Sequence, residues 1–315
     1  MISGILYTIL ACFCWSLVFV IPSLIKEFSP IEIALCRFFF YGLISFTVVL
    51  VKKRHFFSKS YLPLWKTGFL FAFLSTILCY TGSIYNIKYA GPTIATLVFS
   101  MVPITITLAG NWHKRECSFK KLLLPLALMI AGIILAKASS LESKAESLSF
   151  FLIGISCGLV GLASWTVFTV LNSDFLQKQK TLSLNDWGLL TGTATFFLVL
   201  IVSSILACFG KDFSKYSFSH TPFNQFLSLT FLLGTVSTWL SFFLWNKGSK
   251  KLPVSLTGQL MIFEILFALI LIYLFENKAP TSLEITGICL MITGVLTGFK
   301  VVKKSVELAP KSEAL

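Results

Sequence analysis

The chain has 315 residues, of which 56% are apolar and only 12% are charged. This composition excludes an ordinary water-soluble domain, in which about a quarter of the residues are charged. In a soluble protein the net charge of +13 would favour a nucleic-acid partner, but the apolar residues here form runs long enough to cross a membrane. We therefore predict an all-α integral membrane protein whose partner is the lipid bilayer.

Charged and polar stretches divide the chain into ten apolar segments of about 20 residues, the length that crosses a hydrocarbon core about 30 Å thick. The predicted transmembrane helices, numbered below as spans one to ten, cover residues 2–22, 31–51, 64–86, 91–112, 122–138, 149–171, 187–209, 224–246, 253–275 and 284–302. The connections are short, and residues 303–315 form a predicted cytoplasmic tail. No soluble catalytic domain is expected.

Basic residues are unevenly distributed between the two sides of the predicted membrane. With the N-terminus placed in the cytoplasm, the cytoplasmic segments carry 18 lysines and arginines, the opposite segments carry seven, and Arg37 lies within a span. Lysine and arginine concentrate on the cytoplasmic side of membrane proteins. We expect both termini to be cytoplasmic, and we interpret the net charge as a consequence of topology rather than of nucleic-acid binding.

Several short patterns occur twice, in the same order. The pattern Leu-Met-Ile-x-Gly appears at 128–132 and again 162 positions later, at 290–294. ACFCWSLVFV at 11–20 returns as LASWTVFTVL at 162–171, which places Trp165 opposite Trp15 at an offset of 150. YNIKYAGPTIAT at 85–96 faces WNKGSKKLPVSLT at 245–257, with Tyr85 opposite Trp245 and Asn86 opposite Asn246. Colinear matches of this kind indicate an internal repeat.

Each repeat holds five spans, and because five is odd, the second copy must enter the membrane from the opposite side. The sequence therefore predicts two inverted five-helix repeats, at residues 1–138 and 149–302. Inverted repeats around a midplane site are typical of secondary transporters.

Further residues resemble the EamA-type branch of the drug/metabolite transporter superfamily over residues 1–302. They are Trp15-Ser16, Pro22, FSPIEIALCRF at 28–38, the Asn and Pro that precede spans four and nine, and Glu116 and Glu276 after those spans. The resemblance implies ten helices, a small organic substrate and export from the cytoplasm. Two departures stand out: span seven has no counterpart of Arg37, and Ile265 follows Glu264 where the family often has proline, which argues against a sharp break there.

Two ionisable side chains fall inside predicted spans. Glu264 lies 11 residues from either end of span nine, near the bilayer midplane, and Arg37 lies six residues inside span two, about 10 Å from its boundary. A charge at membrane depth costs several kcal/mol unless it faces a cavity or a partner. We interpret Glu264 as a contact for a substrate amine or for a coupling proton, and Arg37 as mainly structural; the alternative is that the two pair with each other.

Aromatic and small polar residues complete the predicted site. Trp15 and Trp165 lie too deep for interfacial anchors and are predicted to line a cavity, where a flat ring stacks a substrate or holds a cation. Spans three, four and eight each carry a stripe of small polar residues, which suits either a cavity wall or plain helix packing. The predicted substrate-binding residues are Glu264, Trp15, Trp165, Tyr85, Asn86, Trp245, Asn246, Tyr80, Ser100 and Arg37.

Catalytic and metal-binding signatures are missing from the sequence. It contains no Gly-rich phosphate loop, nucleophile elbow, H-E-x-x-H or C-x-x-C motif, and His55, His113 and His220 have no second ligand at metal spacing. We predict no enzyme, cofactor or metal. The glycines Gly287, Gly294 and Gly298 are interpreted as a helix-packing face, at a scaffold or homodimer contact.

The sequence thus predicts a secondary active transporter, an exporter of an amino acid, amine or aromatic metabolite, in a prokaryotic inner membrane, with the proton as candidate coupling ion. Three alternatives remain open: an uncoupled channel or facilitator of the same fold, a carrier of nucleotide-type substrates, and a membrane scaffold or lipid-handling enzyme.

Overall fold

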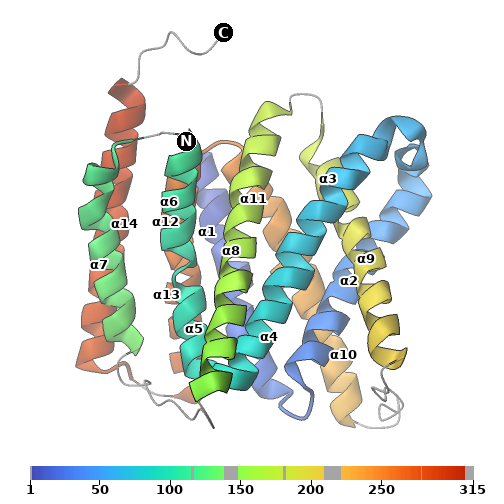
Figure 1. Ribbon diagram of the computed structural model, residues 1–315, viewed down its shortest axis with the longest axis horizontal. Coiled ribbons are helices and arrows are strands. Elements are labelled where there is room, and N and C mark those ends of the chain that lie inside the picture. Colours follow the sequence, from blue (N-terminus) through green and yellow to red (C-terminus); the bar gives the residue numbers. More distant parts are fainter. Residues whose placement is uncertain are drawn as a thin grey trace.

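The computed structural model describes residues 2–114, 117–137, 148–179, 182–208, 221–277 and 279–308. These residues form helices and short links without a β-strand, and the helices stand side by side as one bundle (Figure 1). Nine helical segments of the described chain are long and apolar enough to cross a membrane. The tenth, α7, lies along α14 (Figure 1). The predicted all-α membrane fold is confirmed.

The first half runs from α1 to α7. Its elements are α1 (Ile2–Ser16), two 3-10 turns (Leu17–Phe19 and Ile21–Leu24), α2 (Pro30–Lys52), two 3-10 turns (Arg54–Phe57 and Lys59–Tyr61), α3 (Leu62–Ala72), a π-helix (Phe73–Leu78), α4 (Cys79–Ala90), α5 (Pro92–Ser100), α6 (Val102–Lys114) and α7 (Phe119–Lys137). Span three thus comprises α3, the π-helix and α4, and span four comprises α5 and α6.

The second half repeats this order. Its elements are α8 (Leu148–Lys178), α9 (Leu184–Cys208), α10 (Thr221–Gly234), a π-helix (Thr235–Leu240), α11 (Ser241–Ser249), α12 (Val254–Leu260), α13 (Ile262–Glu276) and α14 (Ser282–Leu308). The expected tail is shorter than predicted, because α14 continues through 303–308; residues 309–315 lie outside the described chain. Glu116, His220 and the side chain of Glu276 also lie outside it.

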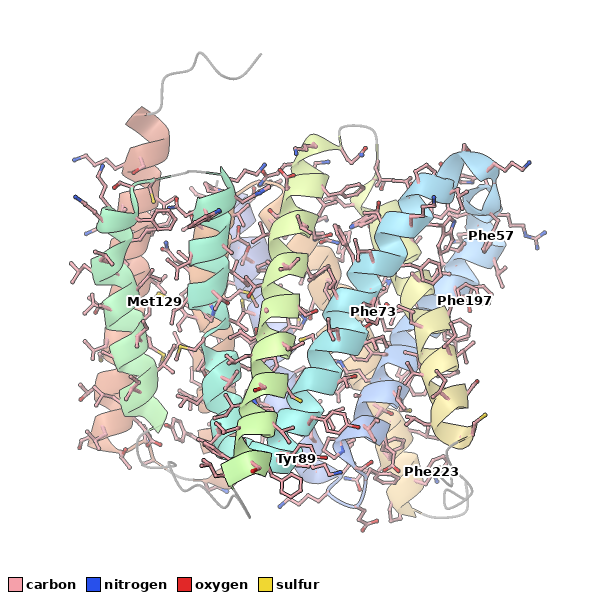
Figure 2. The ribbon with its side chains drawn as sticks, in the orientation of Figure 1. Phe57, Phe73, Tyr89, Met129, Phe197 and Phe223 are labelled. Atoms are coloured by element: carbon pink, nitrogen blue, oxygen red, sulfur yellow. The ribbon has the colours of Figure 1, made fainter. Side chains whose placement is uncertain are left out.

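Irregular turns occur at matching places in the two halves. The two π-helices lie 162 residues apart, and spans four and nine each break once, at Met101 and Met261. The contact between α7 and α14 is reciprocal, since the Cα of Gly132 faces the Met291 side chain while that of Gly294 faces Met129. Figure 2 marks Met129 on α7. These paired features support the inverted repeat, because an approximate two-fold axis exchanges the members of each pair.

The break in span nine differs from the expectation based on Ile265. The backbone of Met261 has ψ near −14°, and its N–H bonds to the carbonyl of Gly258, three residues back. The N–H of Glu264 likewise bonds to Met261, at 3.0 Å. A single 3-10 turn therefore divides the span without a proline, and Glu264 becomes the third residue of α13.

The register between spans three and eight also differs from the sequence alignment. Gly158 packs against the amide of Asn86, and Thr8 packs against Gly248. These two contacts are equivalent only if the offset in this pair of spans is 162, as it is for the π-helices. Tyr85 is then the counterpart of Lys247 and not of Trp245. The alignment was two residues out because α11 ends sooner after its π-helix than α4 does.

Candidate functional site

An aromatic cluster occupies the centre of the bundle. Trp15 of α1 and Trp165 of α8 meet edge to face, with ring centroids 5.8 Å apart. Trp245 and Phe242 of α11 lie 5.3 Å and 5.8 Å from Trp15, and Phe168 lies 5.4 Å from Trp165. The predicted tryptophan pair is brought together because the two residues hold equivalent positions in the repeats, so the two-fold axis passes between them.

A charged cluster lies to one side of these rings, around Arg37. Its Nε donates to Thr238 Oγ1 at 2.7 Å, its Nη1 to the Tyr80 hydroxyl at 2.6 Å, and its Nη2 to the Ser237 carbonyl at 3.2 Å. The guanidinium carbon also lies 5.3 Å from the Tyr80 ring centroid. Ser237 and Thr238 belong to the π-helix of span eight, whose wide turn presents carbonyls that an α-helix would occupy. Arg37 thus pins spans two, three and eight together.

Glu264 faces this charged cluster from α13. Arg37 is the cation that lies near enough to act on its carboxylate. Glu264 forms neither a hydrogen bond nor an ion pair shorter than 4 Å with any side chain of the described chain, so the alternative of a direct Arg37–Glu264 pair is not formed here. The amino end of α13 favours a negative charge at this position. The carboxylate is therefore held in place by its helix and left available.

A neutral cluster lies on the other side of the aromatic rings. Trp187 Nε1 donates to Asn172 Oδ1 at 2.9 Å, and Asn172 Nδ2 donates to Asn246 Oδ1 at 2.9 Å. All three side chains are at least 97% buried. They border a cavity of about 10 Å³, which has room for about one water molecule. The cavity is lined by Tyr41, Phe71, Ala72, Ser75, Phe168, Asn172, Trp187, Thr191, Thr195, Phe242 and Asn246.

Sequence reasoning missed Asn172 and Trp187. Asn172 follows directly after the predicted end of span six at 171, and Trp187 is the first residue of predicted span seven, so both were treated as boundary residues. A signal was present for Trp187, which lies 150 residues after Arg37, the same offset that relates Trp15 to Trp165. The charged and neutral clusters therefore hold related positions in the two repeats.

The remaining predicted site residues lie apart from these clusters. Asn86 is fully buried against Gly158, and neither its Oδ1 nor its Nδ2 has a hydrogen-bond partner in the described chain. Ser100 donates to Thr96 of its own helix at 2.6 Å. Tyr85 is 42% exposed and stacks on Tyr89. Of the ten predicted residues, the structure gathers Trp15, Trp165, Trp245, Asn246, Tyr80, Arg37 and Glu264 around the centre.

The aromatic cluster, flanked by one charged and one neutral polar cluster, lies where a midplane transport site is expected in an inverted-repeat protein. No group of three or more His, Cys, Asp or Glu side chains suited to a metal ion occurs among the described residues. The EamA-like transporter family model matches residues 2–137 and 152–298. The chain belongs to this family.

Two further comparisons agree with the family. The inner membrane protein YtfF of Escherichia coli (strain K12) is 25% identical over 309 residues, which cover 94% of each chain. A solved crystal structure of a protein with 16% sequence identity superposes with a TM-score of 0.75, covering 96% of this chain and 98% of the other. The second likeness concerns the fold alone. This EamA-family protein is accordingly a multi-span membrane transporter.

Proposed function

We propose that this EamA-family transporter is a secondary active carrier that moves a small organic molecule bearing an amino group by alternating access. The observation that carries the proposal is the Glu264 carboxylate, which lies at the break of span nine near Arg37 and has no hydrogen-bond partner in the described chain. A carboxylate in such a place binds a cationic group of the substrate, or a proton when the substrate is absent.

The chemistry around Glu264 supports an amino acid, amine or aromatic metabolite. Three indole rings pack against one another at the centre, and Trp15 and Trp245 are buried. If they separate in another state of the transport cycle, their faces suit an aromatic or aliphatic substrate and stabilise a cation. Arg37 is the one cation beside the centre within the described spans, and its donors already bind Thr238, Tyr80 and Ser237. Phosphate groups are usually bound by several free cationic donors, so a nucleotide-type substrate is less well supported.

The orientation follows from the charges at the bundle ends. The end where α1 begins and α14 ends, at the top of Figure 1 and called the upper end below, carries almost all lysines and arginines of the described links. The opposite, lower end carries Lys26, Lys88 and, at the last residue of α7, Lys137. The positive-inside rule supports an upper end that faces the cytoplasm, and with it cytoplasmic termini in an inner membrane. We propose export as the direction of transport and the proton as the coupling ion.

The test is transport by purified protein in liposomes, with radiolabelled amino acids, amines and aromatic metabolites as substrates and an imposed pH gradient. A coupled carrier accumulates substrate against its gradient. Glu264→Gln is expected to abolish accumulation or its dependence on the pH gradient, because the amide cannot take up a proton or neutralise an amine. Glu27→Gln is the matched control, since Glu27 is an exposed carboxylate in the link after span one.

Other outcomes would contradict the proposal. Flux that only equilibrates substrate, with the Glu264→Gln variant unchanged, supports the channel or facilitator. If the folded protein moves none of these compounds, with or without the pH gradient, the result supports a membrane scaffold instead.

A further inference from the structure

Two lysines share one aromatic ring at the upper end of the bundle. The Nζ of Lys247 lies 5.2 Å from the ring centroid of Tyr7 and 4.2 Å from that of Phe243. The Nζ of Lys251 lies 5.3 Å from the same Tyr7 ring and donates to Ser3 Oγ at 3.2 Å. Neither ammonium forms an ion pair with a carboxylate of the described chain. Two like charges converge here, and the described residues supply no anion between them.

Below the lysines, the same helical face turns aromatic and aliphatic. Trp239, Phe243 and Lys247 are spaced four residues apart, and the rings of Trp239 and Phe243 stack at 6.3 Å with planes 13° apart. On α1, Leu10 and Phe13 are 50% and 44% exposed. Cations at the membrane boundary with apolar side chains beneath them match the layered chemistry of one phospholipid, a charged headgroup above acyl chains.

The helices that carry these residues are held in close contact. The Cα of Gly248 faces Thr8 at a distance that leaves no room for a side chain, and Gly4 faces Leu252 in the same way. Spans one and eight are therefore packed closely enough to present one continuous surface. This surface, the α1/α11 face, is defined by Ser3, Tyr7, Leu10, Phe243, Lys247 and Lys251.

The repeat offers an internal comparison for the α1/α11 face. At the lower end, α4 meets α8 through the equivalent contact of Asn86 with Gly158. The counterparts of Lys247 and Lys251, 162 residues earlier, are Tyr85 and Tyr89. Tyr89 is marked at the lower end in Figure 2. The fold alone therefore does not require paired lysines at this position.

We propose that the α1/α11 face binds the phosphate headgroup of an anionic phospholipid from the leaflet at the upper end. The ammonium groups of Lys247 and Lys251 neutralise the phosphate, and the hydroxyls of Ser3 and Tyr7 donate to its oxygens. The acyl chains lie along Phe243, Trp239 and Leu10. The site is independent of the proposed transport function, and it makes the contact between spans one and eight sensitive to lipid composition.

The experiment compares the wild type with Lys247→Gln/Lys251→Gln, and with Lys88→Gln as matched control. Lys88 lies 5.2 Å and 6.0 Å from the Tyr89 and Tyr85 rings, so its variant removes a cation from an aromatic site at the lower end. Each protein is purified in a neutral detergent and titrated with phosphatidylglycerol or phosphatidylcholine. Bound lipid is counted by native mass spectrometry, and the melting temperature is followed in parallel, because a ligand that binds only the folded state raises it.

Phosphatidylglycerol is expected to bind and to stabilise the wild type and Lys88→Gln more than phosphatidylcholine does. The double variant is expected to lose at least half of the bound phosphatidylglycerol and most of the shift. Lys247→Arg/Lys251→Arg, which keeps both charges, is expected to retain binding.

Three outcomes would overturn the proposal. Equal binding of the two lipids by the wild type would show that charge is not recognised, and unchanged binding by the double variant would place the site elsewhere. An equal shift with inorganic phosphate or glycerol phosphate at the same concentration would indicate an ion site rather than a lipid site. If the double variant does not fold, the exposed Lys251→Gln single variant carries the same test, with a smaller loss of binding expected and no loss overturning the proposal.

Discussion

The charged and neutral clusters hold related positions on the two sides of the aromatic centre, yet their chemistry is opposite. Arg37 donates two hydrogen bonds to the π-helix of span eight and one to Tyr80 of span three. Trp187, 150 residues later, donates one hydrogen bond to Asn172. Only the charged cluster has an available carboxylate beside it, that of Glu264. The repeat therefore places the two clusters at related positions but does not determine their residues. One cluster contains charged side chains, and the other is a buried chain of neutral hydrogen bonds.

The ends of spans one and six show the same divergence. Asn172 lies 150 residues after Pro22, and Pro22 falls where α1 has already given way to 3-10 turns. The α8 helix instead continues to Lys178, where Gln177 Nε2 donates to the carbonyls of Ser249 and Leu252 at 3.1 Å each. Proline inside an α-helix removes one backbone hydrogen bond and kinks or ends the helix. Span six is consequently bonded to span eight at the upper end, while span one leaves its helix before reaching the lower end.

The largest effect on this comparison is expected from Arg37→Leu. The change removes three donors and leaves the Ser237 carbonyl and the Tyr80 hydroxyl without their bonds, so we expect the free energy of unfolding to fall by about 3 kcal/mol. Unfolding in mixed detergent micelles measures it. Arg54→Leu is the control, because Arg54 is exposed in the 3-10 turn after α2 and, among the described residues, its guanidinium bonds to the Leu50 carbonyl of α2. Equal losses for the two variants would contradict the structural role of Arg37.

A smaller loss is expected from Asn172→Leu. The leucine leaves Trp187 Nε1 and Asn246 Oδ1 buried and unpaired, which costs about 1–2 kcal/mol in a membrane protein, where hydrogen bonds are worth less than isolated burial suggests. Hydrogen exchange should show faster opening of the upper ends of α8 and α11. Gln225→Leu, at an exposed amide of α10, provides the control for a generic amide-to-leucine change. If hydrogen exchange is unchanged in Asn172→Leu, the neutral cluster does not hold spans six and eight together.

The smallest effect is expected from Asp174→Asn, which acts at the upper end of the same helix. Asp174 pairs with Lys114 and Lys178, and His113 lies 3.6 Å from its carboxylate. Asp174 is largely buried, but Lys178 is 71% exposed and Lys114 27% exposed, so solvent screens both cations and the expected loss is about 1 kcal/mol. The difference between wild type and variant should shrink further in 1 M salt, whose screening length is about 3 Å. A loss as large as that of Asn172→Leu would mean that the ion pairs, rather than the amide chain, fasten this end.

Helix number, repeat and much of the site were accessible from the sequence for identifiable reasons. The length of an apolar run is set by the membrane, and the odd number of spans per repeat requires the inversion, so neither depends on how helices pack. Trp15 and Trp165 were aligned by the repeat and predicted to line a cavity from their depth, whereas their direct contact was not predicted. Glu264 was selected as a candidate from its depth alone, and its role stays a prediction. Tyr85 was placed wrongly relative to the second half because the alignment relied on letter identity through a link whose length differs between the halves.

The sequence by itself determined where this protein lies, how often it crosses the membrane and how its halves are related, since membrane thickness and parity act on one dimension of the chain. Only the tertiary structure decided which faces meet. Arg37 reaches Thr238 across 201 residues, Asn172 reaches Asn246 across 74, and Lys251 reaches Ser3 across 248. Such contacts depend on the rotation and register of each helix. Close packing at glycines and the 3-10 and π turns set both locally, and the apolar pattern of the sequence does not show them.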